Sequence, residues 1–182
     1  MKWLLIVVAA LAAIVLGVTA VGMALPQNHV AQRSAHFSAS PEKIWAVIAD
    51  AASYPTWRSD VSSVQMLSAE GGRVAWREVS AKGNKLSFEA TTSEPPSHLV
   101  ALITDRGIPF GGSWDYQIVP DGTGSRITIT EHGEVYNPIF RFVSRYVIGH
   151  AATLDTYLKN LAAKLGEAYS ASGNQWRLSG RV

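Results

Sequence analysis

The chain has 182 residues, the size of one ordinary domain with or without an appendage, so a large multidomain architecture is excluded. It carries 16 basic and 14 acidic residues, a balance that argues against a protein whose main role is binding nucleic acid. Only 16% of the residues are charged, 47% are hydrophobic, and there is no cysteine. The absence of cysteine excludes disulfides, zinc–thiolate sites and thiol nucleophiles.

The excess hydrophobicity comes from an uncharged apolar run of 23 residues, Trp3 to Leu25. Because about 20 such residues in a helix span a bilayer core, residues 1–26 are predicted to be an N-terminal transmembrane anchor. The alternative is a cleaved signal peptide, but its apolar core would have only about 7–15 residues. Lys2 precedes the run and the next charge after it is Arg33, which predicts a single-pass membrane protein with its domain on the extracytoplasmic side.

Residues 27–169 are predicted to form one α+β domain, and residues 170–182 lack periodicity and are expected to be a flexible tail. A first strand is expected over Val30–Ser38. Ser40-Pro41-Glu42 then combines an N-cap, a proline at the first helical position and an acid in the first turn, which predicts a helix start. A second short helical turn is expected over Ala51–Tyr54.

Six further strands are separated by turn residues rich in glycine and proline, and their short connections require antiparallel pairing. Their expected ranges are 61–67, 74–80, 85–92, 99–104, 113–119 and 126–135. Together with the first strand they predict one antiparallel meander.

A long helix is expected to close the domain. Asn137-Pro138 repeats the cap-then-proline signal, and apolar residues recur at helical spacing as far as about Tyr169, a length on the order of 45 Å. Val147, Ala151 and Leu154 lie on the apolar face of this helix.

This order of elements resembles the START-like superfamily, also called SRPBCC, and in particular its polyketide cyclase/dehydrase-like branch. The similar segments are SASPEKIWAVIADAASYPTW at 38–57, FGGSWDYQIVPDGTGSRITIT at 110–130 and GEVYNPIFRFV at 133–143. The resemblance implies a helix-grip fold: a seven-stranded antiparallel sheet curved around a long C-terminal helix, with two short helices after the first strand. It also implies a cavity between helix and sheet for a lipid or another apolar ligand.

The residues themselves favour a pocket. A curved sheet cannot lie flush along a straight helix, and large rings with a polar group suit a binding wall, although the same rings can simply fill the core of a small domain. The loop Pro109-Phe110-Gly111-Gly112 is a candidate gate, because two glycines permit backbone movement, and an ordinary strand connection is the alternative. The predicted ligand-binding residues are Trp45, Trp57, Trp76, Phe88, Phe110, Trp114, Tyr116, Glu131, Val147, His150, Ala151 and Leu154.

Glu131 is the main polar candidate, because it follows Ile127 and Ile129 in strict alternation and should point inward. His150 lies at the edge of the inward helix face and is expected to meet it. Such a pair can orient a polar group of a ligand or act as a general base, whereas an acid at the open end of the sheet would only be solvated.

Other chemistries find little support. Gly111-Gly112-Ser113-Trp114-Asp115 lacks the last glycine of a hydrolase nucleophile elbow, and the five histidines show no zinc-helix spacing. No metal, cofactor or nucleic-acid partner is predicted. The sequence therefore favours a membrane-anchored domain that binds a hydrophobic small molecule or lipid without catalysis. A cyclase or dehydratase using Glu131, His150 or Tyr116 and a non-catalytic accessory protein of a membrane complex are the alternatives.

Overall fold

The computed structural model describes residues 1–68, 70–148 and 152–169. Its helices are α1 (Lys2–Ala24), α2 (Pro41–Ile48), α3 (Pro138–Val143) and α4 (Ala152–Leu165). Short 3-10 turns occur at η1 (Ala51–Thr56) and η2 (Glu70–Gly72), and η3 (Ser144–Ile148) is a π-helical turn. The strands are β1 (Asn28–Phe37), β2 (Val61–Ser68), β3 (Val74–Ser80), β4 (Lys85–Glu94), β5 (His98–Ile103), β6 (Phe110–Asp121) and β7 (Gly124–Val135).

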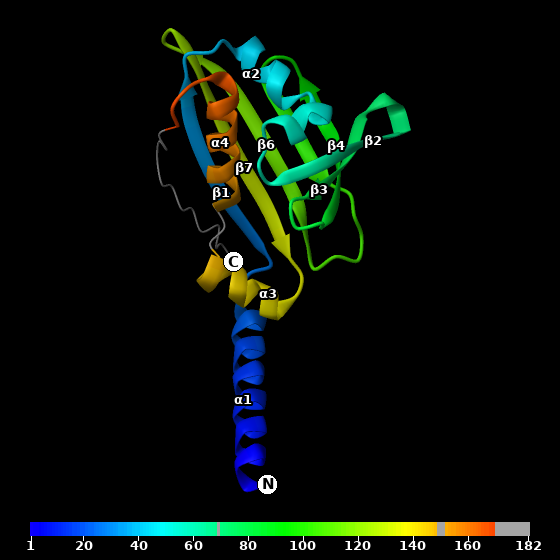
Figure 1. Ribbon diagram of the computed structural model, residues 1–182, viewed down its shortest axis with the longest axis vertical. Helices are drawn as coiled ribbons and strands as arrows, with labels where there is room; N and C mark the ends of the chain where they lie inside the picture. Colours follow the sequence, from blue (N-terminus) through cyan, green and yellow to red (C-terminus); the bar gives the residue numbers. More distant parts are fainter. Residues whose placement is uncertain (69, 149–151, 170–182) are drawn as a thin grey trace.

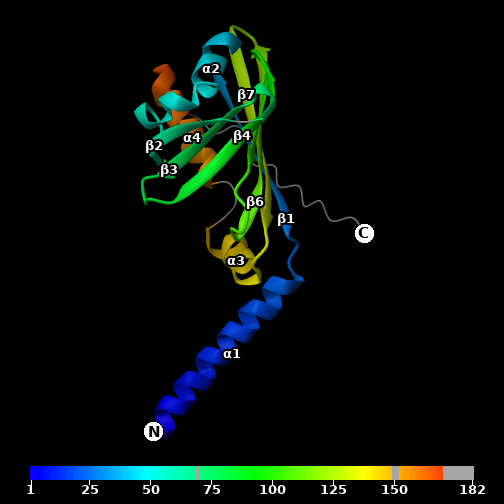
Figure 2. The same ribbon diagram turned by 90° about the vertical axis from the view of Figure 1, so that its right-hand side faces the viewer.

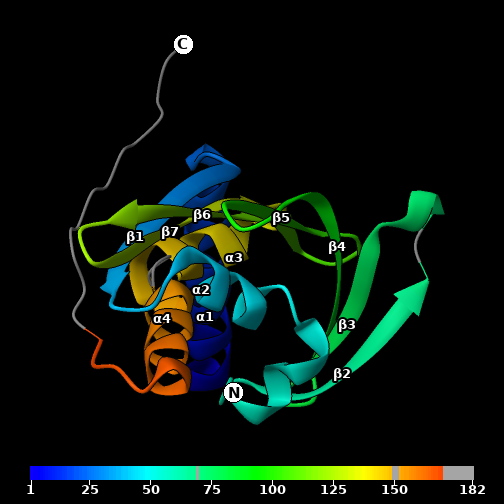
Figure 3. The same cartoon turned by 90° about the horizontal axis from the view of Figure 1, so that it is seen from above.

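In the described part of the chain, the strands form one seven-stranded antiparallel sheet in the order β1-β7-β6-β5-β4-β3-β2. The predicted seven-stranded antiparallel sheet is therefore confirmed: β2 to β7 form a meander, and β1 pairs with β7 rather than with β2. The sheet bends between β5 and β3 so that β2 and β3 curl toward the side that carries α2 and α4 (Figure 3). Register shifts at Ala90/Thr92 in β4 and at Val61/Ser63 in β2 lie in this bent half, where an extra residue sharpens strand curvature.

The α2 region follows the sequence signals closely. Ser40 accepts a hydrogen bond from the Lys43 amide at 3.4 Å, and Pro41 occupies the first helical position. The Tyr54 hydroxyl in η1 donates to the Ile48 carbonyl at 2.6 Å, so η1 is fixed to the end of α2. These two short helices follow β1, as the fold resemblance implies.

The predicted single long helix after Asn137 is instead divided. α3 ends at Val143 and continues into the π-helical turn η3, and α4 begins again at Ala152, while residues 149–151 lie outside the described part. The two helices have different partners: α3 packs on the end of α1, whereas Leu154 and Leu158 of α4 are fully buried against the sheet (Figure 1). A straight helix cannot follow both directions, and a π-helical turn is a common site for such a change.

α4 also ends earlier than the predicted Tyr169. Gly166 has a φ of +74°, and the Gly166 and Glu167 amides donate to the Ala163 and Ala162 carbonyls at 3.1 and 2.9 Å. This is a Schellman stop, in which a glycine adopts the left-handed backbone that other residues avoid. Glu167 then accepts hydrogen bonds from the Ser38 and Ala39 amides, which ties the end of α4 to the turn after β1.

α1 projects away from the domain as a single helix (Figure 2). It is long and apolar enough to cross a membrane, and it lies near the N-terminus, where signal sequences pass the same test. Its C-terminal end meets α3, so the helix joins the domain at the end opposite α2 (Figure 1).

Candidate functional site

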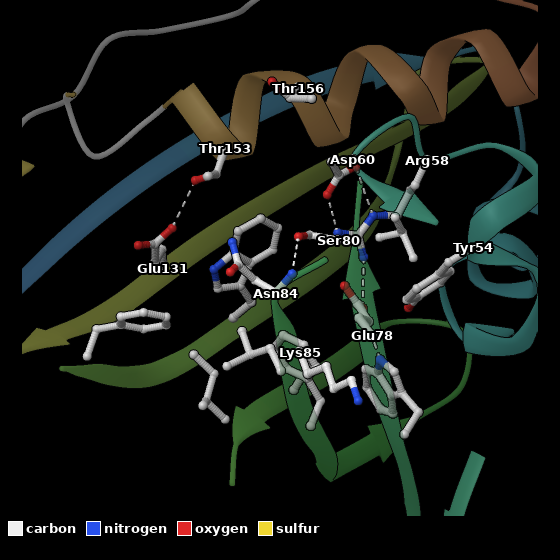
Figure 4. Close-up of a pocket in the computed structure, with 18 of the residues that line it drawn as sticks. Tyr54, Arg58, Asp60, Glu78, Ser80, Asn84, Lys85, Glu131, Thr153 and Thr156 are labelled. Carbon is white, nitrogen blue, oxygen red and sulfur yellow. Dashed lines mark hydrogen bonds and ion pairs between the residues drawn. The ribbon is translucent and has the colours of Figure 1, made fainter. Parts of the chain in front are cut away.

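A cavity of about 500 Å³ lies between α4 and the concave side of the sheet. Figure 4 shows α4 on one side of it and strands of the sheet on the other, with the η1 region and the start of β2 at one end. Its apolar lining consists of Tyr54, Val61, Trp76, Leu86, Phe88, Ala101, Ile103, Phe110, Trp114, Tyr116 and Ala152. Its polar lining consists of Arg58, Asp60, Glu78, Ser80, Asn84, Lys85, Glu131, Thr153 and Thr156.

The apolar wall is built from aromatic rings on neighbouring strands. Trp76 of β3 stacks on Phe88 of β4 with 5.5 Å between ring centroids, because the two residues are paired across the strands. Trp114 and Tyr116 are two residues apart in β6, so both side chains point to the inner face of the sheet. Both rings contact the ring of Tyr157 from α4. Such a wall offers a flat, apolar surface to a ligand.

A buried charged group lies at the η1 end of the cavity. The Arg58 guanidinium donates to the Glu78 carboxylate at 2.9 Å and to the Asp60 carboxylate at 2.6 Å, and the Trp76 indole N–H also donates to Glu78, at 3.0 Å (Figure 4). Only about 10% of each of the Arg58 and Glu78 side chains is exposed. Burial alone lowers the pKa of Arg58, but the Glu78 and Asp60 carboxylates outweigh it and raise that pKa above its usual value.

Three buried tyrosines surround this charged group. The Arg58 guanidinium lies over the rings of Tyr54 and Tyr157, at 5.0 and 5.2 Å from their centroids. Burial raises the pKa values of Tyr54, Tyr116 and Tyr157 well above the ordinary value, so each phenol stays protonated at neutral pH. The Tyr157 hydroxyl makes no hydrogen bond of good geometry among the described residues, although it interacts with the hydroxyls of Tyr54 and Tyr116. The protonated phenols can donate hydrogen bonds but are poor general bases.

Glu131 lies further along the cavity, on β7. Its Oε1 is 3.1 Å from the His29 Nε2 of β1, and its Oε2 accepts a longer hydrogen bond from the Thr153 hydroxyl of α4 at 3.4 Å. The Glu131 side chain points inward, as predicted, because it lines the cavity. The predicted partner His150 lies outside the described residues, and the histidine that the structure places against Glu131 is His29.

The other predicted binding residues fall into three groups. Trp76, Phe88, Phe110, Trp114 and Tyr116 line the cavity together with Glu131. Trp45, Trp57 and Leu154 do not line it among the described residues: both tryptophans pack against the core, and Leu154 is fully buried within it. The side chain of Val147 and all of His150 and Ala151 lie outside the described part of the chain.

The segment Pro109 to Gly112 was predicted to be a loop that acts as a gate, but most of it belongs to a strand. Phe110, Gly111 and Gly112 belong to β6 and pair with Val135, Glu134 and Gly133 of β7. Gly112 has a φ of +123°, and a side chain there would meet the His132 carbonyl. Gly112 therefore allows β6 and β7 to approach closely, which is a different role from the backbone movement of a gate. Phe110 does line the cavity.

Sequence reasoning missed Arg58, Glu78 and Tyr54. Glu78 had a usable signal, because it lies two residues from Trp76 in a strand and so shares its inward face. Arg58 had none, since it is in the loop after η1 and meets Glu78 only through the fold. Among the described residues, no group of histidine and acidic side chains is arranged to hold a metal ion.

Comparisons with known proteins agree on this architecture. The family model described as polyketide cyclase/dehydrase and lipid transport matches residues 28–166. No curated protein matches the chain. Among solved structures, a START superfamily protein from Mycobacterium smegmatis is 20% identical, with 76% of this chain and 97% of that chain covered and a TM-score of 0.59.

Two further solved structures have the same fold at lower identity. Norcoclaurine synthase from Thalictrum flavum is 13% identical, with 77% of this chain and 87% of that chain covered and a TM-score of 0.60. The di-domain ARO/CYC protein StfQ from the steffimycin biosynthetic pathway is 10% identical over 75% of this chain, with a TM-score of 0.62. The present chain spans half of the length of StfQ. At these identities the likeness concerns the fold alone.

Proposed function

The chain belongs to the polyketide cyclase/dehydrase and lipid transport family, and on this basis we propose that it is a membrane-anchored protein that binds a hydrophobic small molecule or lipid in the cavity under α4. The observation that carries the proposal is the cavity itself. Ligand pockets commonly have volumes of about 300–1,000 Å³ and are mostly apolar with a few placed polar groups. The cavity, at about 500 Å³ with a largely aromatic wall, has this character and suits one compact amphiphile.

The charged group at the η1 end suits a ligand that carries an uncharged oxygen acceptor. A guanidinium has five N–H donors, and the hydrogen bonds to Glu78 and Asp60 occupy three of those on Arg58. The two carboxylates outweigh the single positive charge of Arg58, so the group has a net negative charge and would repel an anionic ligand. A carbonyl or hydroxyl oxygen can accept from the remaining donors without adding charge, while the apolar body of the ligand lies along Trp76 and Phe88.

α1 supports the membrane location in the proposal. It is long and apolar enough to cross a bilayer, and Lys2 before it with no charge after it until Arg33 favours a cytoplasmic N-terminus. The domain then lies on the extracytoplasmic side. Tethering of this kind holds a binding domain near the membrane in which an apolar ligand is dissolved, which raises the effective concentration of that ligand.

The test is the recovery of a bound ligand from the full chain. Ala101 is buried and lines the cavity, so Ala101→Trp is expected to fill it and to reduce the amount of co-purifying apolar molecule at least tenfold. The measurement is mass spectrometry of organic extracts of the protein purified from native membranes in mild detergent. Val119→Trp, at an exposed position of β6, is the matched control and should retain the ligand. Equal recovery from wild type and Ala101→Trp would contradict binding in this cavity.

An enzyme of the cyclase or dehydratase type is the second candidate, favoured by Glu131. This carboxylate lines the cavity and is held by His29, an arrangement that suits proton transfer to or from a bound substrate. Turnover of the co-purified molecule during incubation would support this function over simple binding. An accessory role without a ligand is less well supported, because the cavity is larger than the roughly 300 Å³ below which a ligand of this kind would not fit.

A further inference from the structure

Large apolar side chains are exposed on α3 and η3, beside the C-terminal end of α1. Ile139, Phe140 and Tyr146 have 41%, 49% and 61% of their surface exposed. The centroid of the Tyr146 ring lies 5.0 Å from that of Phe142, so these two rings pack against each other. We call Ile139, Phe140, Arg145 and Tyr146 the α3 surface. A group of this kind in so short a segment indicates contact with an apolar partner.

The position of the α3 surface is set by a tight contact between α3 and α1. Gly22 of α1 lies so close to the Pro138 carbonyl that an added Cβ would overlap it. The buried Arg141 guanidinium donates to the Gly22 and Leu25 carbonyls at 3.3 and 3.2 Å, and also to the Val135 carbonyl at 2.8 Å. The Gly22 carbonyl also accepts from the Leu25 amide, and the Leu25 carbonyl lies just past the last turn of α1, so Arg141 caps α1 and joins it to the domain.

The chemistry of the segment fits one partner, the surface of a lipid bilayer. Residues 135–154 contain four aromatic residues and no aspartate or glutamate, and of their two arginines Arg145 is exposed whereas Arg141 is buried in the junction with α1. Tyrosine and other amphipathic rings favour the level of the lipid headgroups, and arginine is attracted to anionic headgroups. The α3 surface is held at the last turn of α1, where a spanning helix leaves the hydrocarbon core.

We propose that the α3 surface is a membrane-docking element that lies in the headgroup region of the same bilayer that α1 spans, an inference that rests on the proposed anchoring. Docking places the cavity beside the lipid. Phe110 lines the cavity and pairs with Val135, and the Tyr136 amide donates to the Pro109 carbonyl at 2.9 Å. The Phe110 end of the cavity therefore adjoins α3, and an apolar ligand passing between bilayer and cavity at this end avoids bulk water.

The experiment uses the absence of cysteine in the full chain. Single substitutions Phe140→Cys and Tyr146→Cys are labelled with an environment-sensitive fluorophore and reconstituted in vesicles of phosphatidylcholine and phosphatidylglycerol at a ratio of about 3:1. Two control positions are labelled in the same way: Ile14→Cys within α1, and Val119→Cys, an exposed apolar position of β6 that belongs to the sheet. Quenching is measured with nitroxide lipids of shallow and deep label position and with aqueous iodide.

The expected result is strong quenching at 140 and 146 by the shallow nitroxide, with at least a threefold loss of iodide quenching relative to 119. Ile14→Cys reports the anchor separately, because its label should be quenched by the deep nitroxide. A deep α1 label together with iodide-accessible labels at 140 and 146 would overturn docking while leaving the anchor standing. Labels at 140 and 146 shielded from both iodide and lipid would indicate a protein partner and also overturn it. Lipid quenching at 140 and 146 without quenching at 14 would support docking and refute the spanning helix.

Discussion

At the scale of single residues, the buried polar atoms beside the cavity differ in whether they have partners. The Tyr54 hydroxyl donates to the Ile48 carbonyl, whereas the Tyr157 hydroxyl and the Trp57 indole N–H make no hydrogen bond of good geometry among the described residues. A buried donor without such a hydrogen bond costs free energy, so Tyr157 is retained at some expense to stability. Its ring contacts Trp57, Trp114 and Tyr116, so the ring of Tyr157 is part of the aromatic cluster beside the cavity.

Two substitutions, each of which removes one hydroxyl, compare the hydrogen-bonded Tyr54 with Tyr157. Tyr157→Phe is expected to leave the free energy of unfolding at pH 7 unchanged or to raise it by up to about 1 kcal/mol, because no hydrogen bond of good geometry is lost. Tyr54→Phe is expected to lower it by about 1–2 kcal/mol, because the Ile48 carbonyl loses its donor. Urea denaturation of both variants in mild detergent, followed by tryptophan fluorescence, measures the difference. A larger loss for Tyr157→Phe than for Tyr54→Phe would refute the assignment.

At the scale of elements, the division between α3 and α4 is the main structural departure from the sequence pattern. α3 is bound to α1 through Gly22 and Arg141, while α4 buries its apolar face on the sheet and stops at Gly166. The connection of α1 to the domain is therefore a packed junction rather than a loose tether. This rigidity holds α3 in one place relative to the end of α1.

The junction is tested by adding one methyl group at either of two glycines of α1. Gly22→Ala is expected to push α3 away, because its Cβ would overlap the Pro138 carbonyl, and overpacking of this kind costs roughly 1–3 kcal/mol. Amide hydrogen exchange in residues 138–143 should then become about tenfold faster, the equivalent of about 1.4 kcal/mol. Gly17→Ala is the matched control, since nothing lies within 4 Å of its added Cβ. Similar exchange in the two variants would mean that Gly22 is not a packing contact.

At the scale of the whole molecule, the family and the fold inferred by resemblance are confirmed. The family model covers residues 28–166, and the sheet curves around α4 as in a helix-grip (Figure 3). The three tyrosines with raised pKa values lie inside this single core, so their protonation is linked to the folding of the whole domain.

This linkage predicts a loss of stability at alkaline pH. Burial raises the pKa of Tyr54, Tyr116 and Tyr157 in the folded state, so the folded domain keeps protons that the unfolded chain releases near pH 10. Their contribution to stability is complete below pH 10 and falls above it by about 1.4 kcal/mol per pH unit for each tyrosine. Urea denaturation between pH 8 and pH 11.5 measures this slope. Tyr157→Phe should reduce the slope by about 1.4 kcal/mol per pH unit, the share of one tyrosine, and a wild-type slope equal to that of the variant would contradict the prediction.

Much of the fold was accessible from local patterns. The two proline caps, at Ser40-Pro41 and Asn137-Pro138, mark helix starts because they satisfy free amides within a few residues of chain. The strand ranges differ from those predicted by at most three residues at either end, because turn residues and alternation act locally. The inward face of β6 and β7, including Glu131, follows from the two-residue period of a strand.

The sequence by itself determined the apolar N-terminal helix, the antiparallel meander and the aromatic inner face, since each depends on composition or on spacing between near neighbours. Only the tertiary structure decided which side chains meet. Arg58 binds Glu78 across 20 positions, Glu131 finds His29 across 102, and Arg141 caps α1 across 119. These contacts depend on how the sheet bends and where the helix after Asn137 breaks, and both result from the packing of elements that are distant in the chain.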